Sequence, residues 1–305
     1  MGGPSGLSCV PNAMGGQNHG PHTGAPPRSS QVMHQDHCPK IIDWKPALAA
    51  AVTAAREAGA LMRKNWRTPK RINATHRHDL KLELDVRCQK RITTRLRRAF
   101  PDIALLGEEG VTGQAQAPTR WVVDPIDGTV NFAFEIPHAC VSIALQTRPD
   151  GPRQSDEDYT SILGVVYDPF CDELWTAIRG HPARLNGRII HASPRTRLSQ
   201  TIVAIGFGKL EGNLERMLPA VANLMNRVRK IRVMGSAALE LVYVASGRLD
   251  AYVEAGVRLW DIAAGGLILE CAGGDFWHRP LPGNLNYRIL ANNGHLRRSL
   301  LRYCG

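Results

Sequence analysis

Apolar residues recur every three or four positions along two early segments of the chain. This period places the apolar side chains on one face of a helix, so it predicts two helices. The first runs from near Asp43 to about Trp66, and the second starts near Asp85 and ends before Pro101. The predicted buried faces consist of Leu48, Val52, Ala55, Gly59, Met62 and Trp66 in the first helix and of Cys88, Ile92, Leu96 and Phe100 in the second.

Beyond Pro101 the apolar residues instead form short runs bounded by turn residues, which is typical of strands. The predicted strands cover residues 103–106, 121–124, 141–147, 162–168, 173–178 and 201–207. Helices are predicted again at about 211–228, 236–247 and 260–272. Long helices, then strands, then both in alternation indicate a layered α/β or α+β protein. The polar insertion 148–159 is predicted to be a surface loop.

The N-terminal segment has a different composition from the rest of the chain. Residues 1–40 are rich in Gly, Pro, Ser, Gln and His and lack apolar periodicity, so they are predicted to be a disordered tail. One domain would then occupy residues 41–305, with an N-terminal half of about 41–195 and a C-terminal half of about 196–305. No apolar run is long enough to span a bilayer, which argues against a membrane partner.

Charge and cysteine content narrow the function classes only a little. The chain of 305 residues carries a formal charge of +11. This charge favours anionic partners such as phosphorylated small molecules, nucleic acid or an anionic surface, or it is a solvated basic surface. The seven cysteines are irregularly spaced, which argues against a disulfide framework and for a reducing compartment. We therefore expect a cytoplasmic location.

Carboxylates stand at the ends of the predicted elements, namely Asp85, Glu108, Glu109, Asp124, Asp127 and Asp261. Pro125 fixes a turn that lets Asp124 and Asp127 converge, and Gly128 lets the backbone approach a ligand. Converging carboxylates stay ionised together only beside cations, and an oxygen-only ligand set suits Mg²⁺. Taken singly, these residues could be helix caps, loop charges or an Asx turn. The spacing of the stretch "DPIDGT" favours a joint metal site for phosphoryl chemistry.

Three motifs together resemble the inositol monophosphatase family of Mg²⁺-dependent, lithium-sensitive phosphatases. They are "GEEG" (107–110), "DPIDGTVNF" (124–132) and "WDIAAG" (260–265), and the resemblance extends over residues 43–295. It implies a layered αβαβα sandwich of the inositol monophosphatase and fructose-1,6-bisphosphatase type. It also implies two or three Mg²⁺ ions in each active site and a homodimer.

The resemblance further implies a role for individual residues. The first metal would be held by Glu108, Asp124 and the Ile126 carbonyl, the second by Asp124, Asp127 and Asp261, and the third by Asp85 with Glu108. Glu108, Asp127 and Thr129 would take part in catalysis, with Thr129 orienting the attacking water. The backbone N–H groups of Gly128 and Thr129 would bind the phosphate end of the substrate, Ala237 and Glu254 its alcohol end, and Asp127 would also contact the substrate. One departure is "HDLKLELD" (78–85), where many members carry a Thr-rich segment, so Lys81 and Glu83 lie near the third metal position.

The substrate implied first is inositol 1-phosphate, hydrolysed to myo-inositol and phosphate by in-line attack of a metal-activated water. Three other substrates remain alternatives, namely fructose 1,6-bisphosphate, histidinol phosphate and 3′-phosphoadenosine 5′-phosphate. The reason is that the metal-binding motifs do not determine which alcohol leaves. A hypothesis of another class is an RNA or ribonucleoprotein binder that uses the basic run 63–71, the "RRAF" region (97–100) and the C-terminal residues. No nucleic-acid motif supports it, so the expected main partner is a small phosphorylated metabolite and not nucleic acid.

Overall fold

A computed structural model describes Gly2 and residues 44–76, 79–149, 155–208, 213–283 and 285–304. All elements below belong to one unit, Asp43–Gly305. Except for Gly2, the predicted tail of residues 1–40 lies outside the described residues, and so does the predicted capping residue Asp43. Within the described part of the chain, every helix is too short or too polar to cross a membrane.

The outer helices, α1 (Lys45–Lys64) and α2 (Glu83–Ala99), confirm the two predicted helices. In α2 three members of the predicted apolar face, Cys88, Ile92 and Leu96, are buried, whereas Phe100 follows the helix and is half-buried. In α1 the face is shifted, and Leu48 and Val52 are only half-buried. The buried positions of α1 are Ala47, Ala51, Ala54, Ala55, Ala58, Gly59 and Met62. Small side chains let α1 approach its neighbours closely, so the bulkier Leu48 and Val52 pack beside the contact and not within it.

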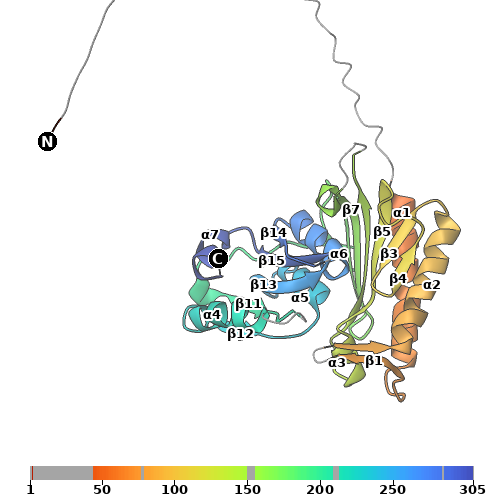
Figure 1. The fold of residues 1–305 in the computed structure, drawn as a ribbon, viewed down its shortest axis with the longest axis horizontal. Helices are drawn as coiled ribbons and strands as arrows, with labels where there is room; N and C mark the ends of the chain where they lie inside the picture. The colour runs from red at the N-terminus through yellow and green to blue at the C-terminus, as the bar shows by residue number, and fades with distance from the viewer. Residues whose placement is uncertain are drawn as a thin grey trace, which may run out of the picture. The chain divides into compact units, whose positions relative to one another are not determined.

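An eight-stranded sheet lies against these helices (Figure 1). Its strands, in spatial order, are β10 (Arg188–Ile189), β9 (Arg184–Leu185), β8 (Glu173–Ile178), β7 (Thr160–Asp168), β6 (Cys140–Thr147), β5 (Thr119–Asp127), β3 (Ala104–Gly107) and β4 (Gly110–Thr112). Neighbouring strands are antiparallel except β3 and β5, which are parallel. The five predicted strands of this region are confirmed.

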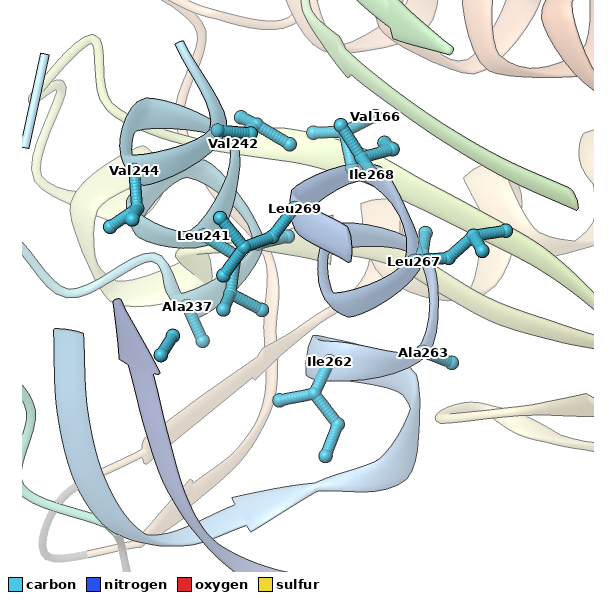
Figure 2. Packing of buried hydrophobic residues seen from close by; sticks show 14 of the residues in the cluster. Val166, Ala237, Leu241, Val242, Val244, Ile262, Ala263, Leu267, Ile268 and Leu269 are labelled. Carbon is cyan, nitrogen blue, oxygen red and sulfur yellow. The ribbon is translucent and has the colours of Figure 1, made fainter. Parts of the chain in front are cut away.

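Two inner helices, α5 (Ala237–Ala245) and α6 (Leu259–Cys271), pack against each other. Figure 2 shows Leu241 of α5 and Leu269 of α6 pointing into the space between them. A Cβ on Gly265 would lie 2.8 Å from the Cβ of Leu241, so only glycine permits this close approach. Both helices are buried around most of their circumference, which is expected for helices with a sheet on each side.

A second sheet has five strands. In spatial order they are β12 (Lys230–Arg232), β11 (Ile202–Ile205), β13 (Ala251–Arg258), β15 (Asn286–Asn292) and β14 (Asp275–Pro280). The outer face carries α4 (Asn213–Met225) and α7 (Arg297–Cys304). The predicted strand 201–207 and helix 211–228 are confirmed as β11 and α4, whereas β13, β14 and β15 were not predicted. β13 and β15 are buried along most of their length, so they lack the apolar–polar alternation of a half-exposed strand.

The layers therefore follow the order helices, sheet, helices, sheet, helices (Figure 1), which confirms the predicted αβαβα sandwich. Three apolar cores fill the spaces between layers. One lies between the outer helices and the large sheet, one surrounds α5 and α6, and one lies under α4 and α7. The remaining elements are β1 (Ile72–His76), β2 (Asp79–Leu82), α3 (Thr129–Ala133), η1 (Asp156–Asp158) and η2 (Leu198–Gln200).

The predicted surface loop 148–159 is only partly a surface feature. Its residues 150–154 lie outside the described residues. Asp156 accepts a hydrogen bond from the buried Arg120, whose guanidinium also stacks on the ring of Tyr159, 3.6 Å from its centroid. A buried guanidinium needs partners, and this segment supplies two of them.

Candidate active site

A cleft of about 280 Å³ opens where the ends of β3 and β5 meet the first turns of α3, α5 and α6 and the strands β11 and β13. Nine of the ten residues predicted for the site line it: Glu108, Asp124, Ile126, Asp127, Gly128, Thr129, Ala237, Glu254 and Asp261. Asp85 is the exception and lies outside the lining. The structure thus brings together residues from both sheets and from the helices between them.

Asp124, Asp127 and Asp261 form the acidic centre of the cleft. One carboxylate oxygen of each lies within 4.8 Å of an oxygen of the other two. Asp124 and Asp127 would face opposite sides of a regular strand, because side chains three positions apart do so. The β5–β6 ladder is irregular between them, with Asp124 opposite Ser142 and Asp127 opposite Cys140. This bulge at Pro125 and Ile126 turns both carboxylates to the same side.

Backbone N–H groups orient two of these acids. Asp124 Oδ1 accepts the N–H of Ile126 at 2.9 Å, and Asp261 Oδ2 accepts the N–H of Arg258 at 2.8 Å. The first contact is an Asx turn and the second caps α6. The alternative roles considered for Asp124, an Asx turn, and for Asp261, a helix cap, are therefore confirmed as well. A turn or a cap uses only one carboxylate oxygen, and it fixes the direction in which the other oxygen points.

Asp127 is held from the other half of the fold. Its Oδ2 accepts hydrogen bonds from the Ser236 hydroxyl and the Ala238 N–H, both at 2.7 Å. These donors belong to the first turn of α5, where N–H groups lack partners within the helix and favour negative charge. Ser236 was not predicted from the sequence, although it directly precedes the predicted substrate residue Ala237.

Asp85 and the two glutamates after β3 form a second acidic group. Asp85 is 3 % exposed, its Oδ2 accepts the N–H of Leu82 at 2.7 Å, and its Oδ1 has no hydrogen-bonding partner among the described residues. Burial, with a smaller contribution from Glu108 and Glu109, raises the pKa of Asp85 to about 8. Lys81, one of the departures from the family pattern, forms an ion pair with Glu109 at 3.0 Å.

These carboxyl groups fit a divalent cation. The set offers oxygen ligands only, and it includes one buried carboxyl oxygen, Asp85 Oδ1, that no donor among the described residues satisfies. Hard cations such as Mg²⁺ prefer this type of ligand. Buried like charges are costly without a counter-charge, and bound cations would supply one.

The turn after β5 brings backbone close to the cleft. Gly128 has a φ of 89°, and a Cβ there would lie 2.8 Å from the His138 carbonyl oxygen, so this position requires glycine. Thr129 begins α3, and its hydroxyl donates to the Ile126 carbonyl at 2.8 Å. Asn131 joins this turn to the loop before α5, because its Nδ2 donates to the carbonyls of His138 and Met234. Asn131 was quoted within the motif, but no role was assigned to it.

The opposite end of the cleft is formed by the small sheet. Glu254 of β13 accepts a hydrogen bond from the hydroxyl of Tyr252. The backbone of Gly206 covers this carboxylate so closely that a Cβ would lie 1.8 Å from Glu254 Oε2. Arg258 and Phe207 also line the cleft, and neither was predicted from the sequence.

The fold and the acidic cleft define a class of metal-dependent phosphatases. Residues 43–301 match the model of the inositol monophosphatase family, and the chain therefore belongs to this family. It is 37 % identical to Nus factor SuhB of Escherichia coli (strain K12) over 254 residues, which cover 81 % of this chain and 90 % of the relative. It is 35 % identical to inositol monophosphatase 1 of Solanum lycopersicum, over 83 % of this chain and 93 % of that protein. The crystal structure of the extragenic suppressor protein suhB from Bartonella henselae superimposes with a TM-score of 0.75 at 34 % identity, covering 85 % of this chain and 98 % of that one.

Proposed function

We propose that the protein is a Mg²⁺-dependent phosphomonoesterase that converts inositol 1-phosphate to myo-inositol and phosphate. The observation that carries the proposal is the convergence of Asp124, Asp127 and Asp261 within 4.8 Å in a cleft that Gly128 and Thr129 also line. Membership of the inositol monophosphatase family supports the same chemistry.

The metal ligands proposed are those of the family pattern. Glu108, Asp124 and the Ile126 carbonyl would hold one ion, Asp124, Asp127 and Asp261 a second, and Asp85 with Glu108 a third. Bound Mg²⁺ would neutralise the carboxylates and the phosphate, activate a water and stabilise the leaving oxygen. The backbone N–H groups of Gly128 and Thr129 would receive the phosphate oxygens at the first turn of α3.

The hydrogen bond of Thr129 sharpens its proposed role. A hydroxyl has one proton, and that of Thr129 is donated to the Ile126 carbonyl. Toward a water molecule the hydroxyl oxygen is then an acceptor only. Thr129 would therefore orient the attacking water by accepting a hydrogen bond from it, and the water's lone pair would be directed to the phosphorus.

The alcohol end of the substrate would lie against Ala237 and Glu254. A carboxylate accepts hydrogen bonds from the hydroxyl groups of a polyol, and a small alanine side chain leaves room for its ring. Both residues line the same cleft as the metal ligands. The tomato relative is named an inositol monophosphatase, which agrees with a polyol phosphate as the substrate.

A phosphate-release panel tests the proposal. Purified protein is assayed with inositol 1-phosphate, fructose 1,6-bisphosphate, histidinol phosphate, 3′-phosphoadenosine 5′-phosphate and p-nitrophenyl phosphate, with Mg²⁺ or with EDTA. We expect Mg²⁺-dependent release from all substrates that fit, with the highest kcat/KM for inositol 1-phosphate. A higher value for another physiological substrate would change the substrate assignment, and no release from any of them would refute the enzyme itself.

The family resemblance carries three further expectations. Li⁺ should inhibit phosphate release, the protein should be a homodimer, and it should reside in the cytoplasm. A Li⁺ titration, light scattering coupled to gel filtration, and cell fractionation check these in turn.

A second, non-enzymatic role is favoured by the outer face of α2. Five exposed cations follow one another along this helix, namely Arg87, Lys90, Arg91, Arg97 and Arg98. Within the described residues, none of the five forms an ion pair. A row of cations at helical spacing suits the phosphates of single-stranded RNA, and the E. coli relative is named a Nus factor and not a phosphatase.

Salt dependence of RNA binding tests this role. If the five cations contact phosphates, log K should fall with log salt with a slope of about −3.5 for a single strand. The change Arg91→Glu should weaken binding at every sequence, whereas Arg279→Glu on β14 makes the same charge reversal at another exposed position and is the matched control. Equal RNA binding by both variants would refute the proposal that the α2 cations bind RNA.

A further inference from the structure

A buried carboxyl group lies behind the substrate end of the cleft and has no part in the chemistry described above. Glu240 stands on α5 and is 1 % exposed. Its Oε1 accepts the N–H of Met234 at 3.1 Å. A carboxyl group removed from water requires a reason, because it is rarely retained without satisfied partners.

The side chain of Tyr252 connects Glu240 to the cleft. Tyr252 is fully buried on β13, and its hydroxyl donates to the Glu254 carboxylate. The same hydroxyl also interacts with the carboxyl group of Glu240. Three side chains from α5 and β13 therefore form a row that starts in the core and ends at the cleft.

The row contains two carboxyl groups and one phenol. Ionising both carboxyl groups would place two negative charges close together in a buried site, which is energetically unfavourable. Burial raises the pKa of Glu240 well above its ordinary value, and the nearby carboxylates of Glu254 and Asp127 raise it further. The Met234 N–H opposes this rise. The Tyr252 hydroxyl would oppose it as well if its proton were given to Glu240, but its single proton is donated to Glu254, so toward Glu240 the phenol oxygen is an acceptor. Glu254 is half-buried at the cleft, where water or a ligand can reach it, so the negative charge belongs there.

We propose that Glu240 is a neutral carboxylic acid that acts through Tyr252 to hold Glu254 as an ionised acceptor for a substrate hydroxyl. Glu240 donates its proton to the Tyr252 oxygen, and Tyr252 donates its own to Glu254. Glu240 is thus a positioning residue for recognition of the polyol. The inference rests on the proposed function, because it specifies how Glu254 selects an alcohol that offers a hydroxyl donor.

The surroundings of Glu254 support a fixed acceptor. Gly206 leaves no room for a Cβ on one side of the carboxylate, and Tyr252 holds it on another. α5 also connects the two ends of the cleft, since its first turn carries both the Ala238 N–H that holds Asp127 and the side chain of Glu240. A rigid acceptor pays little entropy when a hydroxyl binds, which favours selectivity for polyols.

Substitutions along the row test the proposal. With inositol 1-phosphate, Tyr252→Phe should raise KM about tenfold, because Glu254 loses a charge-assisted hydrogen bond, while kcat changes little. With p-nitrophenyl phosphate, which has no ring hydroxyl, Tyr252→Phe should leave kcat/KM near the wild-type value. Tyr287→Phe, at a buried tyrosine of β15 outside this cleft, is the matched control and should change neither substrate.

Substitutions of Glu240 itself separate a neutral acid from an anion. In Glu240→Gln the amide can still accept from Met234 and donate to Tyr252, so the selectivity for inositol 1-phosphate should be retained. Glu240→Met removes the donor at similar volume and should reproduce the effect of Tyr252→Phe. A selective loss in Glu240→Gln equal to that in Glu240→Met would overturn the proposal, and so would an equal loss on both substrates in Tyr252→Phe.

An infrared measurement separates this inference from the proposed function. The difference spectrum of wild-type protein minus Glu240→Gln at neutral pH should show the carbonyl stretch band of a protonated carboxyl group, since the protonated Asp85 contributes equally to both spectra and cancels. If no phosphate ester is hydrolysed, the proposed function fails while the band still decides the state of Glu240. If the band is absent while the protein hydrolyses phosphate esters, the proposed function is supported and the proposal that Glu240 is protonated is refuted.

Discussion

The two ends of the cleft hold their carboxylates in different ways. At the metal end, defined here as Glu108, Asp124, Asp127 and Asp261, backbone N–H groups orient Asp124, Asp127 and Asp261. At the substrate end, defined as Glu254 with Tyr252 and Glu240 behind it, the carboxylate accepts a hydrogen bond from a side chain, the Tyr252 hydroxyl. The first end is thus anchored in the main chain and the second in a row of side chains.

This difference implies a division of labour. Backbone donors favour the ionised form of a carboxylate and fix its orientation, as a cation site requires. A row of side chains can be changed by substitution without moving the main chain. Changes at the metal end should therefore reduce turnover of every phosphate ester alike, and changes at the substrate end should alter the preference among alcohols.

The largest effect is expected at the metal end. Asp124→Asn should lower Mg²⁺-dependent kcat by about 10³-fold with both inositol 1-phosphate and p-nitrophenyl phosphate, because a charge that stabilises the transition state is lost. The amide oxygen of the new side chain can still accept the Ile126 N–H, so the turn is preserved. Phosphate release and circular dichroism measure activity and fold.

The exposed Asp102, which follows α2 and Pro101, provides the control for this substitution. Asp102→Asn makes the same chemical change outside the cleft and should leave kcat unchanged. If Asp124→Asn kept full Mg²⁺-dependent activity, the metal end would be assigned to the wrong residues. If it affected only one of the two substrates, the division between the two ends would fail.

The next effect is expected at the substrate end. Glu254→Ala should lower kcat/KM for inositol 1-phosphate by roughly 30-fold, since hydrogen bonds to a charged group contribute about 1.5–3 kcal/mol. For p-nitrophenyl phosphate the change should be below about twofold, because no ring hydroxyl contacts this carboxylate. Equal losses on the two substrates would mean that Glu254 supports the fold of the cleft and does not select the alcohol.

The same contrast explains which parts of the site could be predicted. Asp124, Asp127 and Asp261 stand beside turn and helix-start signals, so a few neighbouring residues already indicate their geometry. The contact between Ser236 and Asp127 spans 109 positions, and Tyr252 and Glu240 lie in apolar segments that indicate only burial. Pairs that form through the folded chain leave no local pattern, so these residues emerge only from the structure.

The fold was predictable to a similar degree and for a similar reason. Most helices and the strands of the large sheet follow from local periodicity, and the αβαβα order follows from the motifs. The shifted face of α1 and the strands β13 and β15 did not follow, because close packing and burial on both faces erase the expected pattern.

A smaller effect is expected where α5 supports the metal end. Ser236→Ala removes one of the hydrogen-bond donors to Asp127 but retains the Ala238 N–H. The kcat/KM should fall about tenfold for inositol 1-phosphate and p-nitrophenyl phosphate alike, as expected for one hydrogen bond to a charged group. Ser246→Ala, at the other end of α5, is the matched control and should have no effect on either substrate. A change in the ratio of the two substrates would place Ser236 at the substrate end.

The smallest effect is expected from Asp85, whose assignment to the metal end is the least direct. Like the other aspartates it accepts a backbone N–H, but it lies outside the cleft lining, and its second oxygen has no partner among the described residues. Water molecules between Asp85 and an ion would weaken the electrostatic attraction between the two.

Asp85→Asn should therefore raise the Mg²⁺ concentration for half-maximal activity about threefold, for an interaction on the order of 1 kcal/mol, and leave kcat at saturating Mg²⁺ unchanged. Glu83→Gln, two positions away in the same turn and paired with the exposed Arg71, should leave the Mg²⁺ midpoint unaltered. A loss of kcat as large as that of Asp124→Asn would make Asp85 a full member of the metal end, whereas an unchanged midpoint would reduce it to a cap of α2.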